Sequence, residues 1–192
     1  MTFQTWVGAA QKSPGVAEQF NSEDMQIGLF PNDNIAHQLE QQRLETFANL
    51  LTNGKTIFQV VPNIQVQRWE KVVWNAAWNS LTTLTLLDTK SWLNSSPDAT
   101  PLTRRLMREV IDVARRSDVP IEYSLIDRLM DKIMGMPGIG SSMQADYMNA
   151  KPMEIEVILG TPVKKARELG MSVPILETLY TVLTALNGRL LP

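Results

Sequence analysis

The sequence predicts a mainly α-helical protein that carries a small α/β piece at its N-terminus. The strand-like stretches, residues 25–30 and 56–61, both lie in the first third of the chain. After residue 61 no convincing strand pattern recurs, and the segments that follow begin and end with residues typical of helix boundaries. With 192 residues, 44% of them hydrophobic, the chain is long enough to bury one ordinary core.

The first third of the chain is expected to hold a partial α/β piece, residues 1–63. Its opening residues, 1–24, are mixed in composition and are expected to be irregular, because they contain three turn-forming residues: Gly8, Pro14 and Gly15. Alternating polarity over residues 25–30 and β-branched residues within 56–61 predict two short strands. The amphipathic pattern of residues 35–51 predicts a helix between them. Two short strands and one helix cannot form a sheet that is stable alone, so this piece should be the end of a larger α/β domain.

The remainder, residues 64–192, is expected to form an all-α domain with its own core. Proline, glycine and asparagine residues divide it into segments of helical length. Helices are predicted at about residues 65–87, 97–116, 123–134, 153–169 and 174–187, with a short additional helix opened by residues 141–143.

Composition and charge exclude several functional classes. The formal net charge is -2, the sequence pI is about 5.5, and no basic tail or long charge run occurs, which argues against nucleic-acid binding. The chain has no cysteine and one histidine, so disulfide frameworks, thiolate sites and multi-histidine metal sites are excluded. No stretch of the sequence is apolar and long enough to span a bilayer, and no signal-peptide pattern opens it. We therefore expect a cytoplasmic protein with no metal site and with neither a membrane nor a nucleic acid as partner.

The most informative segment is a helix-like run around Lys71. Lys71, Asn75 and Asn79 recur at intervals of four residues, which places them on one face of a helix. The residues between them are apolar: Val72, Val73, Trp74, Ala76, Ala77 and Trp78. A helix that is apolar nearly all round is expected to be buried. A buried row of one ammonium and two carboxamides is unfavourable unless something polar occupies it, and a polar ligand is the simplest occupant.

Further segments follow this run in a recognisable order. The set comprises Trp69-Glu70-Lys71 with Asn75 and Asn79-Ser80-Leu81-Thr82, then Ser141–Asp146, Glu154–Gly160 and Gly170–Pro174. In these residues the chain resembles the ketopantoate reductase (2-dehydropantoate 2-reductase) family, specifically its C-terminal helical domain. The short strand ending in Ile27-Gly28 fits the end of the family's first domain, and the closing helix with Leu179-Tyr180 fits as well. No single motif is specific, but the resemblance covers essentially the whole chain. The resemblance implies a helical domain similar to the C-terminal domain of 6-phosphogluconate dehydrogenase.

The resemblance also implies a second half that this sequence does not contain. Family members have an N-terminal nucleotide-binding domain with a Gly-x-Gly-x-x-Gly turn, and this sequence has no such turn. Residues 1–63 are therefore expected to be the tail of a truncated Rossmann domain. The implied activity of the complete protein is reduction of a 2-keto acid, of the 2-dehydropantoate-to-pantoate type, with NADPH. We do not expect this chain alone to bind NADPH tightly, and the surface left by the missing half predicts a homo-oligomer.

Carried over residue by residue, the resemblance implies roles for five side chains. Lys71 is expected to be the general acid that protonates the ketone oxygen, which suits a cation placed where negative charge develops. Asn75 and Asn79 would bind hydroxyl and carboxylate oxygens of the substrate, and Ser142 would help hold the carboxylate. Glu154 would orient the substrate and the nicotinamide end of the cofactor. Two positions where the family often has asparagine differ here and bear on which keto acid is bound: Thr89 and Ile139.

Simpler interpretations stand beside these roles. Ser141 and Ser142 form a typical N-cap pair, and a glutamate such as Glu154 is favoured in the first turn of a helix. Glu156 competes with Glu154 as the carboxylate of the site. The alternative function is a non-catalytic helical interaction or dimerisation module that has kept the family core without the nucleotide site.

Overall fold

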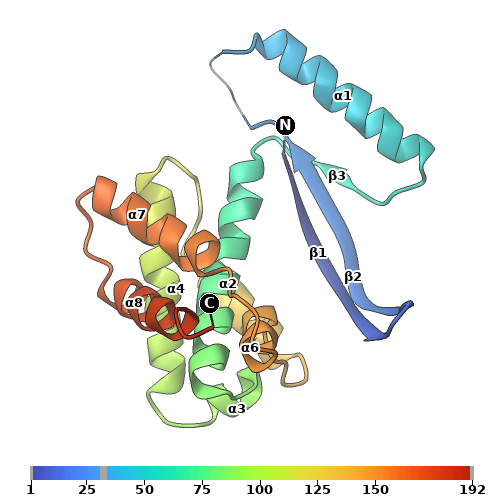
Figure 1. Ribbon diagram of the computed structural model, residues 1–192. Coiled ribbons are helices and arrows are strands. Elements are labelled where there is room, and N and C mark those ends of the chain that lie inside the picture. The colour runs from blue at the N-terminus through green and yellow to red at the C-terminus, as the bar shows by residue number, and fades with distance from the viewer. Residues whose placement is uncertain (1, 31–33, 191–192) are drawn as a thin grey trace. The chain divides into compact units, whose positions relative to one another are not determined.

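The computed structural model describes residues 2–30 and 34–190, whose helices and strands are drawn in Figure 1. The chain divides into two compact units, with the boundary between Arg68 and Trp69. The division lies inside the long helix α2 (Ile64–Thr85), a few residues beyond the boundary expected after residue 63. The first unit carries a small sheet and one helix, and the described residues of the second unit form helices joined by loops, with no strand among them. The protein is therefore mainly α-helical, as predicted.

The first unit is built on a three-stranded sheet in the order β1–β2–β3. β1 (Thr2–Ser13) and β2 (Val16–Gly28) form a long antiparallel hairpin, and β3 (Gln59–Val60) pairs with β2 in parallel. α1 (His37–Asn53) lies between β2 and β3 in the sequence. Because two parallel strands cannot be joined by a tight turn, β2, α1 and β3 form a βαβ connection.

The expectation of irregular structure over residues 1–24 is wrong, because these residues form most of the hairpin. Gly15 has a φ of +81°, a conformation that favours glycine, and together with Pro14 it makes the turn between the strands. Gly8 coincides with a shift in the strand register, where a strand accommodates an irregularity. The turn-forming residues therefore shape the hairpin instead of interrupting regular structure.

A small apolar cluster forms where the sheet meets the start of α2. The strand predicted at residues 25–30 is present as the end of β2, while the second predicted strand is reduced to the two residues of β3. Ile27 and Ile64 are fully buried, and the backbone N–H of Val61 donates to the carbonyl of Ile27 at 2.9 Å. At Gly28 a Cβ would lie only 2.8 Å from Cβ of Ile64, so this close approach requires glycine.

The other helices of the second unit follow α2 in the sequence and are joined by short loops. Their bounds are α3 (Thr89–Leu93), α4 (Ala99–Arg116), α5 (Ser124–Met134), α6 (Ser142–Met148), the π turn η1 (Glu156–Gly160), α7 (Thr161–Glu168) and α8 (Pro174–Asn187). The predicted helices at 97–116, 123–134 and 174–187 are confirmed to within a few residues.

The short helix α3 was not predicted. Its N-terminus is capped by Asp88, whose Oδ1 accepts hydrogen bonds from the backbone N–H groups of Lys90 and Ser91, both at 2.9 Å. A helix of five residues depends on such a cap and on its neighbours, because so short a helix is unstable alone. It is also too short to show the repeated apolar spacing from which helices are predicted.

The helix predicted at residues 153–169 begins later and opens with the wider turn η1. Pro162 gives a physical reason for the difference. Proline has no N–H to donate to the carbonyl four residues earlier, that of Ile158, and its ring crowds this carbonyl. The helix therefore widens before Pro162 and becomes regular in α7. Such π turns are frequent near functional sites.

Helix α4 runs through the core of the second unit and contacts both α7 and α8. Its apolar face is fully buried and comprises Leu106, Met107, Val110, Ile111, Val113 and Ala114. Its half-buried Glu109 also caps α8, because one carboxylate oxygen accepts from the N–H of Ile175 at 3.1 Å and the other from that of Leu176 at 2.8 Å. Val173, the residue before α8, has an apolar side chain that cannot accept these hydrogen bonds.

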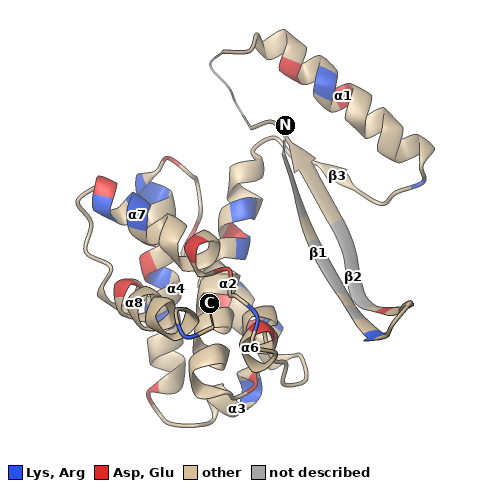
Figure 2. Ribbon diagram, viewed as in Figure 1, with Lys and Arg blue, Asp and Glu red and all other residues tan. Residues whose placement is uncertain are grey.

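Basic and acidic residues alternate over the helices of the second unit (Figure 2). Several of them form exposed ion pairs, such as Lys165 with Glu168 at 3.1 Å and Arg167 with Glu177 at 3.0 Å. None of the helices within the described residues combines the length and the apolar character needed to cross a bilayer.

Candidate active site

The predicted row of Lys71, Asn75 and Asn79 lies on α2, which is buried from residue 76 to residue 83 and partly exposed over most of its first half. Asn79 is only 5% exposed, while Lys71 and Asn75 are half-buried. Four of the apolar residues between them lie in the core, namely Val73, Ala76, Ala77 and Trp78. Trp78 is 2% exposed and packs edge-on against the half-buried Trp74, at 5.8 Å between ring centroids. The burial of the apolar residues therefore places Asn79 in the protein interior and leaves Lys71 and Asn75 partly exposed.

The two carboxamides of the row are available for a ligand. Among the described residues, neither Asn75 nor Asn79 forms a side-chain hydrogen bond. The neighbouring hydroxyl of Ser80, in contrast, donates to the carbonyl of Ala76 in the same helix at 2.6 Å. The carboxamide of Asn79 is not among the fully buried polar atoms that lack a partner, so it still reaches solvent and can bond to a polar group that binds beside it.

Lys71 and Glu154 interact electrostatically although they come from distant parts of the chain. Burial lowers the pKa of Lys71 below its usual 10.5, and the charge of Glu154 acts in the opposite direction. A lysine whose pKa is lowered releases its proton more readily, and a nearby carboxylate keeps it cationic. This electrostatic interaction supports the predicted pairing of the two residues.

Ser141 and Ser142 lie at the Asn79 end of the polar row. Ser141 is the N-cap of α6, because its Oγ accepts from the backbone N–H of Gln144 at 3.1 Å, as the simpler interpretation expects. Ser141 Oγ also forms a 2.7 Å hydrogen bond with the hydroxyl of Thr82. Thr82 follows Asn79 by three residues and therefore lies on the same side of α2. The exposed Ser142 begins α6 directly beside this contact.

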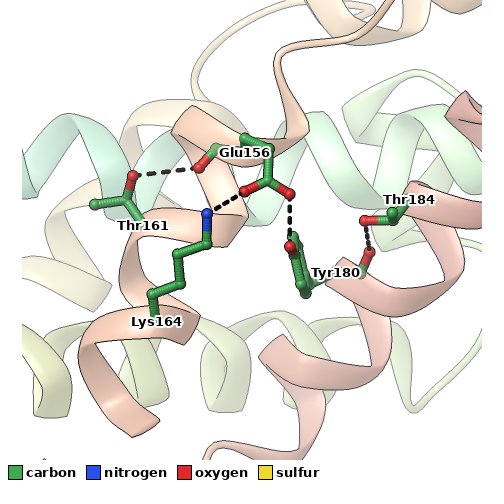
Figure 3. A network of polar contacts seen from close by, with 5 residues as sticks. All are labelled: Glu156, Thr161, Lys164, Tyr180 and Thr184. Atoms are coloured by element: carbon green, nitrogen blue, oxygen red, sulfur yellow. Dashed lines mark hydrogen bonds and ion pairs between the residues drawn. The ribbon is translucent and has the colours of Figure 1, made fainter. Parts of the chain in front are cut away.

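The competing carboxylate, Glu156, is engaged elsewhere (Figure 3). Lys164 Nζ donates to its Oε2 and the hydroxyl of Tyr180 donates to its Oε1, both at 2.5 Å. These bonds, that of Lys164 first, hold the pKa of Glu156 below its usual value. Glu156 is thus paired with Lys164, whereas the charge of Glu154 acts on Lys71, and this difference favours Glu154 as the carboxylate of the site.

The two positions at which the resemblance implies a departure, Thr89 and Ile139, are bonded to each other. The N–H of Thr89 donates to the carbonyl of Ile139 at 3.0 Å, and the N–H of Ile139 donates to Oγ1 of Thr89 at 3.2 Å. Gly138 also lies against Asp88, so closely that a Cβ would collide with the carboxylate. The start of α3 therefore fixes the loop that leads into Ser141.

Sequence reasoning gave no role to Thr82, Lys164 or Tyr180, although each holds a segment of the site in place. The sequence did contain a signal for the last two, because Pro162 inside a predicted helix marks a local break. Thr82 carried no comparable signal, since its contact with Ser141 depends on how α2 and α6 pack.

These groups suit a small anionic ligand with hydroxyl and carbonyl oxygens. The described residues contain no cluster of three or more histidine, aspartate or glutamate side chains that could hold a metal ion. The sequence has no Gly-x-Gly-x-x-Gly turn for the phosphates of a dinucleotide. What the chain offers is one cation, two amides and a hydroxyl, which are donors for a keto acid.

Comparison with known proteins points in the same direction. The family profile described as "Ketopantoate reductase PanE/ApbA C terminal" matches residues 63–187. The 2-dehydropantoate 2-reductase of Nostoc sp. is 32% identical over 147 residues, which are 77% of this chain and 46% of that protein. An uncharacterized protein of Saccharomyces cerevisiae is 28% identical over 189 residues, 96% of this chain and 52% of the relative. The chain thus spans about half the length of the curated relatives it matches.

Solved structures of the same family superpose on nearly the whole chain. The 2-dehydropantoate 2-reductase of Methylococcus capsulatus has 27% identity and a TM-score of 0.83, covering 99% of this chain and 63% of the other. The dimeric ketopantoate reductase of Staphylococcus aureus has 25% identity and a TM-score of 0.80, covering 98% and 62%. D-mandelate dehydrogenase in complex with NADH, at 18% identity and a TM-score of 0.83, shares the fold. The family match, the buried lysine–asparagine row and the helical architecture agree, and the chain belongs to the ketopantoate reductase family.

Proposed function

We propose that this chain forms the substrate side of an oxidoreductase that reduces a 2-keto acid of the 2-dehydropantoate type with NADPH. One observation carries the proposal: Lys71 is half-buried with a lowered pKa, its charge interacts with Glu154, and it shares a helix face with two amides that have no hydrogen-bond partner among the described residues. The names of the relatives, 2-dehydropantoate 2-reductases, support the substrate class.

Lys71 would act as the proton donor. Reduction of a ketone places negative charge on its oxygen, where a positioned ammonium both stabilises the charge and supplies a proton. The lowered pKa of Lys71 brings proton transfer nearer to neutral pH. Glu154 opposes this lowering and thereby keeps a larger fraction of the lysine protonated before the reaction.

Asn75, Asn79 and Ser142 would hold the substrate. A carboxamide donates to a carboxylate and accepts from a hydroxyl, so it can bind both ends of a hydroxylated keto acid without adding charge. The half-buried Asn75 and the buried Asn79 lie along α2 from Lys71, and Ser142 lies at the far end of the row. The row therefore offers a proton donor at one end and carboxylate-binding groups at the other.

NADPH would supply the hydride from a nucleotide-binding domain of the complete protein. We propose that the first unit is the end of that domain, since its β2–α1–β3 connection is of the βαβ kind found in such domains. Neighbouring structures include NADH complexes of D-mandelate dehydrogenase and a dimeric ketopantoate reductase, which supports a nicotinamide cofactor and a homo-oligomer. NADPH should bind this chain alone only weakly.

The proposal is tested by titration calorimetry of the chain with 2-dehydropantoate and with pantoate. We expect saturable binding that Asn79→Ala weakens about tenfold or more, because a hydrogen bond to a charged group contributes about 1.5–3 kcal/mol and 1.4 kcal/mol is tenfold. Asn53→Ala, at the exposed end of α1, is the matched control and should leave binding unchanged. Equal binding by wild type and Asn79→Ala, or no binding by either, would leave the non-catalytic interaction module as the better interpretation.

A further inference from the structure

Glu154 lies on a short segment that α8 holds at both ends. The backbone N–H of Met153 donates to Oδ1 of Asn187 at 2.8 Å, and the hydroxyl of Tyr180 donates to Oε1 of Glu156 at 2.5 Å. Tyr180 and Asn187 are separated by about two helical turns on α8, so they project from the same face of that helix. One helix therefore fastens the chain on either side of Glu154.

The residues next to Glu154 are anchored as well. Met153 and Ile155 are 6% and 2% exposed, whereas Glu154 between them is exposed. A rotation of the backbone that moved Glu154 would bring these two apolar side chains into water, which is unfavourable. The direction in which Glu154 projects is thus coupled to the packing of its neighbours.

The turn that follows is locked by a network of polar contacts around Glu156 (Figure 3). The second carboxylate oxygen accepts from Lys164 Nζ at 2.5 Å, and the hydroxyl of Thr161 donates to the carbonyl of Glu156 at 3.2 Å. Gly160 lies directly against this network, because a Cβ there would be 2.8 Å from Oε2 of Glu156 and 3.2 Å from Cε2 of Tyr180. A larger residue at position 160 would therefore crowd the side chains of this network.

We propose that Tyr180, Asn187 and Glu156 are positioning residues that hold Glu154 where its charge acts on Lys71. The functional meaning of this arrangement rests on the proposed role of Lys71 as proton donor. Burial and the charge of Glu154 both influence the pKa of Lys71, and they act in opposite directions. If the segment loosens, Glu154 moves away, the pKa of Lys71 falls further, and a larger fraction of the lysine is neutral and unable to donate a proton.

The test is the pKa of Lys71 in the full 192-residue chain, measured by NMR of 13C-labelled lysine and assigned with Lys71→Arg. Tyr180→Phe removes only the hydroxyl that binds Glu156, and Asn187→Ala removes the acceptor for Met153. We expect each variant to lower the pKa of Lys71, and the double variant to bring it close to the value in Glu154→Gln. Thr181→Ala is the matched control on α8, because this exposed hydroxyl donates only to the carbonyl of Glu177 in its own helix.

The decisive comparison is made in the Glu154→Gln background. If α8 acts through Glu154, Tyr180→Phe and Asn187→Ala should cause no further change there, whereas a merely structural effect would lower the pKa of Lys71 by the same amount with or without Glu154. An unchanged pKa in the double variant, or in Glu154→Gln itself, would overturn the proposal.

Glu156→Gln keeps an acceptor for Tyr180 but weakens the bond to Lys164, and it provides an independent loosened variant if Tyr180→Phe does not fold. Titration with 2-dehydropantoate reports separately, because absent binding would remove the proposed function and leave the effect on Lys71 in place.

Discussion

Replacing Glu109 by alanine should lower the free energy of unfolding of the second unit by about 2–4 kcal/mol. The carboxylate accepts one hydrogen bond from the N–H of Ile175 at 3.1 Å and one from that of Leu176 at 2.8 Å. Hydrogen bonds to charged groups contribute about 1.5–3 kcal/mol each, and an anion at a helix N-terminus adds about 0.3–1 kcal/mol. The expected loss lies around and below the lower end of that sum, because Glu109 is half-buried and water can replace part of the interaction.

Glu109→Gln should cost less, about 1–2 kcal/mol, since the amide keeps one acceptor oxygen but loses the charge. Glu168→Ala is the control, because its ion pair with Lys165 is largely exposed and should contribute less than about 1 kcal/mol. The measurement is urea unfolding followed by tryptophan fluorescence. Four of the five tryptophans lie in the second unit, namely Trp69, Trp74, Trp78 and Trp92, so the signal reports mainly on that unit.

With a slope of roughly 2 kcal/mol per molar urea, the midpoint for Glu109→Ala should fall by about 1–2 M. The slope itself should not change, because the variant alters one cap and not the surface exposed on unfolding. A midpoint within about 0.2 M of wild type, or a loss no larger than that of Glu168→Ala, would refute the assignment of Glu109 as the cap of α8.

Three further outcomes are expected. Lys71→Met should stabilise the chain at neutral pH, because it removes a charge that burial disfavours. The folded pKa of Lys71 lies below 10.5, so the wild type gains stability as pH rises from that pKa toward 10.5, and the advantage of Lys71→Met in urea unfolding should shrink over that range. An advantage that grows over that range would contradict the desolvation argument. Thr83→Val should raise the unfolding free energy by about 1 kcal/mol, because Thr83 is 1% exposed and its hydroxyl has no partner among the described residues; a loss of stability would show that the hydroxyl is bonded in solution. In a fusion that supplies a nucleotide-binding domain of this family, Lys71→Ala should reduce turnover of 2-dehydropantoate about 10²–10⁴-fold with little change in NADPH affinity, and a change confined to NADPH affinity would exclude Lys71 as the acid.

The parts of the fold that the sequence predicts well are those set by local spacing. Helix α2 and the position of Lys71, Asn75 and Asn79 on one face follow from a four-residue interval that any helix converts into a row. The π turn could be anticipated only in part, because Pro162 marks a break but does not say which way the helix adjusts. The hairpin of β1 and β2 was not predicted, because its strands pair with each other and need no continuous apolar face. The only clear local signals over residues 1–24 were the turn-forming residues.

The parts of the candidate site that could not be predicted depend on packing between distant segments. The bond between Thr82 and Ser141 joins α2 to α6, and neither residue carries a local pattern that points to the other. The separation of Glu154 from Glu156 is of the same kind. Both are glutamates at the start of a predicted helix, and only the contacts of Glu156 with Lys164 and Tyr180 distinguish them.

The reciprocal bonding of Thr89 and Ile139 has a consequence for how this protein can change in evolution. One of the two bonds joins main-chain atoms only, and the other uses the main-chain N–H of Ile139, so the side chain of Ile139 takes no part in either. Position 139 can therefore accept a different side chain while the loop before α6 stays in place. Position 89 is less free, because its side chain must still offer an acceptor. Substitutions at position 139 would thus leave in place the scaffold that carries Ser141 and Ser142.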